Sequence, residues 1–238
     1  MLRTSNLSIG FDHSSPLLQG VDLSIGKGEC ILLCGANGSG KTTLMKTLCG
    51  EMAPLEGKIV REGEVIMIPT RIPKVRGFRV KDFILSSLPG ARSWSPAVGP
   101  LEKERERRAV ELLSIESLEE RDLSTLSDGE FQKCCIAAGL GRLLVDGKEG
   151  MKEGLILLDE PTAFLDVDAR REILSTLGSL SRNEGISVLF SSHDLPDSLS
   201  QAERVLVVAR DRRLVSSSGS PEERLCAIAQ GFPGMQRL

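Results

Sequence analysis

The chain has 238 residues, of which 40% are hydrophobic and 26% are charged. This length suits one α/β domain with a sizeable core, and the composition excludes an intrinsically disordered protein. A formal net charge of -3 excludes a global basic field that would draw the chain to nucleic acid or anionic lipid. The longest apolar runs fall far short of the ~20 residues that a membrane-spanning helix needs.

The first predicted elements are short strands that lead into a glycine-rich loop. Val21–Ile25 and Cys30–Cys34 are strand-like runs, broken by Gly26, Lys27 and Gly28. The continuous apolar run Cys30–Cys34 indicates a strand buried on both faces of a sheet. Glycines follow at once, and Thr42–Leu48 then has helical character. The predicted order is therefore strand, glycine-rich loop and helix.

The middle of the chain has a different composition. Residues 75–144 are rich in Leu, Glu and Arg, and Glu102–Leu113 carries Glu and Arg at helical spacings. We therefore predict a mainly helical subdomain at about 75–144, inserted into an α/β core formed by residues 1–74 and 145–238. A glycine-rich, charged stretch at 147–154 is predicted to be a surface loop.

Strands and helices alternate after the helical region. The predicted elements are strand Leu155–Leu158, helix Val167–Leu180, strand Ser187–Phe190, helix Pro196–Ala202 and strand Arg204–Val208. Alternation of this kind implies a mostly parallel sheet, so the predicted fold class is α/β.

The glycine-rich loop fits the phosphate-binding pattern G-x-x-x-x-G-K-[ST] in full, because residues 35–42 read GANGSGKT. Glycines let successive backbone N–H groups face one anion, and the following helix adds its positive N-terminal end. Lys41 would reach the β- and γ-phosphates of ATP, and the Thr42 hydroxyl would bind Mg²⁺. The residues assigned to nucleotide binding here are Gly35, Asn37, Gly38, Ser39, Gly40, Lys41, Thr42 and Thr43. The alternative is a glycine-rich turn with a chance lysine, which the preceding strand and following helix disfavour.

Two carboxylates end the apolar run Leu155–Leu158. They are Asp159 and Glu160, and neighbouring residues at a strand end point in different directions, so the two acids can have different tasks. Asp159 would act on the Mg²⁺ shell, and Glu160 would polarise the water that attacks the γ-phosphate. A solvated acidic turn is the alternative, and the phosphate loop in the same chain favours the catalytic interpretation.

A further motif lies between these two sites, where residues 126–130 read LSDGE. This segment resembles the signature motif of the ABC family, usually Leu-Ser-Gly-Gly-Gln, and the resemblance covers about residues 2–223. It implies a P-loop NTPase fold of the RecA-like type, with an inserted helical subdomain and an N-terminal antiparallel β part. It also implies that two such domains pair head to tail. Ser127 and the Gly129 amide would then contact the γ-phosphate bound by the other subunit.

Other residues resemble functional positions of the same family. Asp166 ends a segment similar to the family's D-loop and would lie at the dimer interface. His193 follows an apolar strand, as the family's switch histidine does, and would touch the γ-phosphate, so Glu160 and His193 are the predicted catalytic residues. Phe11 occupies the position of an aromatic ring that stacks on adenine, with apolar packing as the alternative. The other histidine, His13, is assigned no role.

Three residues depart from the family pattern. Thr70 stands where a glutamine normally follows the strand before the helical subdomain, and its shorter hydroxyl would need a bridging water to reach Mg²⁺. Asp128 replaces a glycine of the signature, and Glu130 replaces its glutamine. Two extra carboxylates near a triphosphate would repel it, so we expect both side chains to face away.

The resemblance implies an ATPase that powers a membrane transporter as a separate cytoplasmic subunit, peripheral on the inner face of the plasma membrane. Residues 78–84 and 162–166 are similar to ATPases of importers for iron chelates, haem and cobalamin. The basic segment 70–81 and the helical subdomain would dock on ABC transmembrane permease subunits, although a basic segment can also be only a solvated face. ATP would drive a head-to-tail homodimer, with Mg²⁺ as cofactor and no nucleic acid partner.

Three alternatives stay open on the sequence. The chain could serve an ABC exporter or another ABC complex. It could be a soluble ABC protein that acts on ribosomes or DNA, although its length and charge disfavour this. It could also be a regulatory protein that holds ATP with weak hydrolysis, as Thr70 and the altered signature suggest.

Overall fold

A computed structural model describes residues 1–89, 99–144 and 154–231, so residues 147–153 of the predicted surface loop lie outside the described part. The strands in chain order are β1 (Leu2–Ile9), β2 (Leu18–Val21), β3 (Ser24–Ile25), β4 (Cys30–Gly35), β5 (Glu56–Arg61), β6 (Glu64–Ile68), β7 (Gly154–Leu158), β8 (Ser187–Ser191), β9 (Arg204–Val208) and β10 (Leu214–Ser217). The α-helices are α1 (Lys41–Cys49), α2 (Val80–Ser87), α3 (Pro100–Leu113), α4 (Asp128–Leu143), α5 (Val167–Glu184), α6 (Leu195–Gln201) and α7 (Pro221–Gly231). Two short 3₁₀ helices, η1 (Glu116–Leu118) and η2 (Leu123–Thr125), connect α3 to α4.

The strands form two sheets. β1 pairs with β2, β3 and β5 in an antiparallel sheet near the N-terminus. The second sheet has the order β10-β9-β4-β8-β7-β6, and every neighbouring pair in it is parallel except β10 with β9. The predicted α/β class, with a mostly parallel sheet and an N-terminal antiparallel part, is confirmed.

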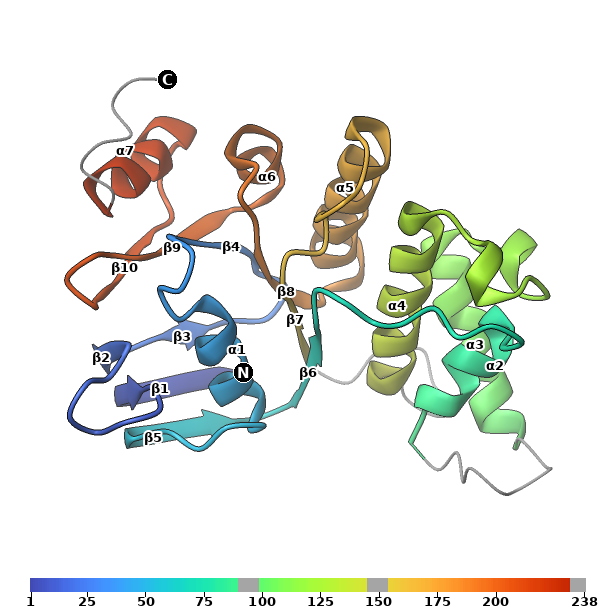
Figure 1. The fold of residues 1–238 in the computed structure, drawn as a ribbon, viewed down its shortest axis with the longest axis horizontal. Coiled ribbons are helices and arrows are strands. Elements are labelled where there is room, and N and C mark those ends of the chain that lie inside the picture. The colour runs from blue at the N-terminus through green and yellow to red at the C-terminus, as the bar shows by residue number, and fades with distance from the viewer. Residues whose placement is uncertain (90–98, 145–153, 232–238) are drawn as a thin grey trace.

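β4 lies between two hydrophobic cores, which explains its uninterrupted apolar run. Side chains alternate along a strand. Cys30, Leu32 and Cys34 therefore pack into a core with helices α4 to α7, whereas Ile31 and Leu33 pack into a core with α1 and the antiparallel sheet. Figure 1 shows the same layers, with α5, α6 and α7 on one side of the parallel sheet and α1 and β1 on the other.

One predicted strand, Val21–Ile25, is divided in the structure. Val21 ends β2 and Ser24 begins β3, because the hydroxyl of Thr4 inserts between them. This hydroxyl donates to the carbonyl of Val21 at 2.8 Å and accepts from the amide of Leu23 at 2.9 Å. The side chain of Thr4 thus takes the place of a backbone carbonyl in the hydrogen bonding between β1 and the segment that joins β2 to β3.

Helices α2, α3 and α4 gather at one end of the molecule, beyond β6 and α5 (Figure 1). α4 packs closely on the sheet edge, since a Cβ at Gly139 would lie 3.0 Å from Cδ1 of Ile68. These helices share one continuous hydrophobic cluster with the parallel sheet. The division into a core and an inserted subdomain therefore stays a prediction. No helix in the described residues has both the length and the apolar character of a membrane span.

A carboxylate is buried inside the helical part. Glu106 of α3 is only 8% exposed, and its Oε1 has no hydrogen-bond partner within the described ranges. The pKa of Glu106 is raised from 4.5 to about 7, chiefly by burial; the neighbouring Glu119 and Glu120 contribute to this rise, and Lys81 opposes it. In the folded protein Glu106 therefore stays protonated up to about pH 7, whereas in the unfolded chain it loses its proton near pH 4.5.

We expect Glu106→Gln to stabilise the protein at about pH 8 by roughly 1–3 kcal/mol and to have little effect near pH 5. Between the unfolded pKa of 4.5 and the folded pKa of about 7, the native state binds more protons than the unfolded state. Stability therefore falls as pH rises through this window. Thermal unfolding of both variants across pH tests this, with Glu116→Gln, an exposed carboxylate, as the control. Equal shifts in the two variants would contradict the prediction.

Candidate functional site

The phosphate loop runs from the end of β4 to the start of α1 and has an unusual backbone. Gly38 has a φ of 74° and Gly40, the N-cap of α1, has a φ of 104°, both in the left-handed region that favours glycine. A Cβ at Gly38 would have no neighbour within 4 Å in the described structure. The loop is therefore curled and open above Gly38. Asn37 and Thr42 are exposed beside it, whereas Thr43 is buried in α1.

Two side chains of the loop have the properties expected of a phosphate site. The hydroxyl of Ser39 is buried and lacks a hydrogen-bond partner in the described residues, so it is available to an anion. Lys41 is 6% exposed, and its ammonium donates to the carbonyls of Gly35 at 2.8 Å and Ala36 at 3.2 Å. Burial lowers the pKa of Lys41, while the nearby Glu160 and Asp159 raise it. A buried cation placed between this loop and two carboxylates fits a phosphate and metal site.

The two predicted metal ligands meet at the end of β7. The hydroxyl of Thr42 donates to Oδ2 of Asp159 at 2.7 Å, and Asp159 is only 7% exposed. Mg²⁺ in nucleotide sites is commonly held by one or two protein oxygens together with waters and phosphate oxygens. The adjacent oxygen atoms of Thr42 and Asp159 are therefore suitable ligands for Mg²⁺.

Glu160 and His193 also lie together, although they are 33 residues apart in the chain. Oε1 of Glu160 is 2.7 Å from Nε2 of His193. Glu160 has a φ of 49°, a left-handed conformation that a carboxylate residue adopts only at some cost. The two side chains line a hollow of about 490 Å³ together with residues that follow β7 and β8. This geometry can present a carboxylate to a water molecule at the sheet edge.

Ser191, which the sequence analysis did not single out, joins the two carboxylate residues. Its hydroxyl donates to Oδ1 of Asp159 at 3.0 Å and accepts from the backbone amide of Glu160 at 2.9 Å. It therefore fixes both the Asp159 side chain and the turn that carries Glu160. The sequence signal that could have found Ser191 is its position at the end of a buried strand, two residues before His193.

The signature loop, residues 125–130, caps α4. Ser127 is the N-cap residue, and its hydroxyl accepts from the amide of Glu130 at 3.2 Å, while Oε2 of Glu130 accepts from the amide of Ser127 at 2.8 Å. This reciprocal pair is a capping box. The hydrogen bond from the Ser127 amide lowers the pKa of Glu130, as does the guanidinium of Arg121. Glu130 thus has a structural partner within its own loop.

The remaining signature residues are placed by neighbours from other elements. Asp128 pairs with Lys74, with a distance of 2.7 Å between Oδ1 and Nζ. A Cβ at Gly129 would lie 3.0 Å from Cβ of Ala169 in α5, so a larger residue would press on that helix. Both departing carboxylates, Asp128 and Glu130, face cations of their own chain.

Asp166 and Thr70 each follow one of two neighbouring strands, β7 and β6. Asp166 is the N-cap of α5, where its Oδ1 accepts from the amide of Ala169 at 2.8 Å. β6 and β7 are paired as far as Ile68 opposite Leu158, and Thr70 comes two residues after the end of β6. A role for Thr70 at the metal stays a prediction. The part of Asp166 in a dimer stays a prediction.

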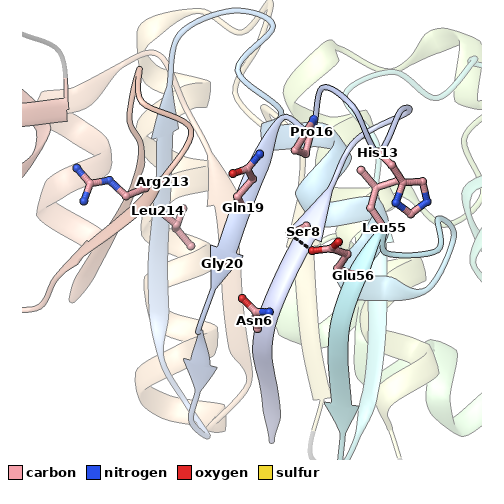
Figure 2. A pocket seen from close by; sticks show the side chains of 10 residues that line it. All are labelled: Asn6, Ser8, His13, Pro16, Gln19, Gly20, Leu55, Glu56, Arg213 and Leu214. Atoms are coloured by element: carbon pink, nitrogen blue, oxygen red, sulfur yellow. Dashed lines mark hydrogen bonds between the residues drawn. The ribbon is translucent and has the colours of Figure 1, made fainter.

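Phe11 is 81% exposed in the loop between β1 and β2, which disfavours simple core packing and leaves its ring available for stacking. A separate hollow of about 580 Å³ lies on the antiparallel sheet near this loop, and His13 contributes to its wall. Figure 2 shows the lining side chains of this hollow, including Ser8 and Glu56, whose hydrogen bond crosses from β1 to β5. These residues come from β1, β2, β5, β10 and nearby loops, so this hollow is distinct from the phosphate loop.

The chain is similar to known proteins over most of its length. Residues 18–163 match the family model described as ABC transporter. The petrobactin import ATP-binding protein of Bacillus anthracis is 29% identical over 222 residues, which cover 88% of this chain and 78% of the relative. An energy-coupling factor transporter ATP-binding protein of Streptococcus pyogenes is 29% identical over 227 residues, which cover 89% and 75%.

Solved structures show the same fold. A metal-chelate type ABC transporter in an inward-facing conformation superposes with a TM-score of 0.80 at 24% identity, covering 96% of this chain and 88% of the other. A dimeric ATP-binding cassette bound to ADP and phosphate gives a TM-score of 0.71 at 19% identity, covering 92% and 98%. At these identities the likeness concerns the fold alone.

Proposed function

The chain belongs to the ABC transporter family, and on that premise we propose that it is the ATP-hydrolysing subunit of an importer for an iron chelate, haem or cobalamin. The observation that carries the ATPase chemistry is the meeting of Thr42 with Asp159, and of Glu160 with His193, next to the phosphate loop. The relative named for petrobactin import supports the direction and class of transport. The similarity of residues 78–84 and 162–166 to importer ATPases also supports it.

Each residue of the site has a task in this proposal. The loop amides and Lys41 bind the phosphates, and Thr42 and Asp159 hold Mg²⁺. When bound, Mg²⁺ neutralises charge on the phosphate oxygens. Glu160 orients the attacking water, and His193 holds the Glu160 carboxylate and reaches toward the γ-phosphate. Catalysis is then mainly a matter of positioning and charge stabilisation.

A second copy of the chain would complete each site. Ser127 and Gly129 would contact the γ-phosphate held by the other subunit, and Phe11 would stack on the adenine. In the capping box the Ser127 hydroxyl accepts from the amide of Glu130, and because a hydroxyl can accept and donate at once, it can still donate to a phosphate oxygen. The fold likeness to a dimeric cassette is compatible with this assembly.

The permease would dock on segment 70–81 and the helices beyond it, at the cytoplasmic side of the plasma membrane. Much of the positive charge in this segment already has a partner. Arg71 lies 4.6 Å over the ring of Phe164, and Arg79 pairs with Asp82 at 3.0 Å. Docking would therefore depend on the shape of the segment more than on a free basic patch.

We expect the chain to support ATP-dependent uptake of a labelled ferric chelate when it is reconstituted in vesicles with permease subunits from neighbouring genes. The Glu160→Gln variant, assembled in the same way, is the matched control and should abolish uptake. ATP hydrolysis that drives no uptake of chelate, haem or cobalamin would contradict the importer assignment. A second candidate function is that of ATPase in an energy-coupling factor transporter, which the relative from Streptococcus pyogenes supports. Co-purification with energy-coupling factor components would favour this candidate instead.

A further inference from the structure

Lys74 joins the segment after β6 to the signature loop. Its ammonium donates to the carbonyl of Leu126 at 2.8 Å and to Oδ1 of Asp128 at 2.7 Å. Its Nζ also lies 5.5 Å from the ring centroid of Phe131. The side chain of Lys74 is 26% exposed, whereas that of Asp128 is 62% exposed. One half-buried cation thus holds both the backbone and a side chain of the loop.

A second cation holds the same loop in the same manner. Arg121 donates to the carbonyl of Thr125 at 2.7 Å and to Oε1 of Glu130 at 2.8 Å. Each carboxylate of the loop is therefore paired with a cation that also binds a loop carbonyl. Such charge-assisted hydrogen bonds are stronger than neutral ones, and here they set the position of Ser127 and Gly129 between them.

We propose that Lys74 is a positioning residue for ATP hydrolysis, which holds the signature loop and neutralises Asp128 where a second copy of the chain presents its γ-phosphate. The inference rests on the proposed function, in which Ser127 and Gly129 contact that phosphate. Asp128 lies between these two residues, so an unpaired carboxylate there would repel the triphosphate. Asp128 is 62% exposed, and an ion pair with one solvent-exposed partner contributes little to folding, so the loss of Lys74 acts mainly on the assembled ATP site.

The test measures ATP-driven dimer formation by light scattering in the Glu160→Gln background, where the readout does not require hydrolysis. Lys74→Met keeps the apolar stem and removes the charge. We expect it to weaken dimer formation about tenfold, because the unpaired charge of Asp128 would then repel the triphosphate. Binding of a fluorescent ATP analogue to the dilute monomer should stay unchanged. Adding Asp128→Asn should restore most of the dimer, and Lys103→Met, at an exposed lysine of α3, is the control.

Two results would overturn the role of Lys74. One is that Lys74→Met, in the Glu160→Gln background, forms dimers at the same ATP and protein concentrations as the Glu160→Gln protein itself. The other is a double variant as weak as Lys74→Met alone, because the charge of Asp128 would then not be the cause. A Glu160→Gln chain with Lys74 intact that binds ATP and never dimerises would refute the head-to-tail assembly itself, and with it the basis for this role. Unchanged thermal unfolding of Lys74→Met shows that its defect is not one of folding.

Discussion

Lys41→Ala is expected to lower the affinity for ATP by about 100-fold, which corresponds to the loss of roughly 3 kcal/mol of charge-assisted hydrogen bonding. The ammonium of Lys41 is buried beside the phosphate loop and donates to the carbonyls of Gly35 and Ala36. Bound phosphates would offer it fully charged acceptors in place of these carbonyls. Isothermal titration calorimetry with ATP measures the change directly.

A matched control separates the charge of Lys41 from a general loss of positive potential. Lys46→Ala removes an exposed lysine from the same helix, α1, and should leave ATP affinity unchanged. Thermal unfolding of both variants checks that α1 and the loop remain folded, because Lys41 also supports the loop backbone. Unaltered ATP binding by a folded Lys41→Ala variant would show that the nucleotide is held elsewhere.

The elements that carry the phosphate loop and the acidic pair were predictable because each has a strong local pattern. β4 and β7 are apolar at every position that faces a core, so their runs stand out in the sequence. β5 was not predicted, because Glu56–Arg61 is largely exposed. Ile59 is the one residue of this strand that is partly buried, and Lys58 and Arg61 place charges on either side of it. It is a strand because β1 pairs with it.

The contacts that organise the site could not be predicted, because they join residues that are far apart in the chain. Ser191 meets Asp159 and Glu160 only because β8 lies beside β7 in the register Leu158 to Phe190. A serine at a strand end has many ordinary roles, so its sequence position alone favours none. The same holds for Lys74, whose partners lie more than 50 residues further along the chain.

The roles of the site residues stay predictions for a physical reason. The structure shows which groups are close together, and closeness is required for catalysis but also occurs in ordinary ion pairs. The contact of Glu160 with His193 is one example, since an ordinary hydrogen bond between two partly exposed side chains has the same geometry. A variant that preserves this contact and removes the carboxylate chemistry distinguishes the two cases.

Glu160→Gln is that variant, and we expect it to lower the turnover number at least ~100-fold while ATP still binds. Glutamine has the size of glutamate and keeps an oxygen that can face Nε2 of His193, 2.7 Å away in the parent. It has no negative charge with which to polarise a water molecule. ATP that binds and is not cleaved should hold two copies together, so light scattering should detect a dimer with ATP and a monomer without nucleotide.

The control for Glu160→Gln is Glu203→Gln, the same change at an exposed glutamate just before β9. It should hydrolyse ATP at the parental rate and should form no stable ATP-bound dimer, because each cycle of cleavage separates the subunits. Turnover is measured as phosphate release, and affinity by calorimetry in the same preparation. If Glu160→Gln retained parental turnover, the water would be activated by another group, and the contact with His193 would be structural. If it lost ATP binding as well, the defect would lie in the fold of the turn after β7, which Ser191 holds through the amide of residue 160.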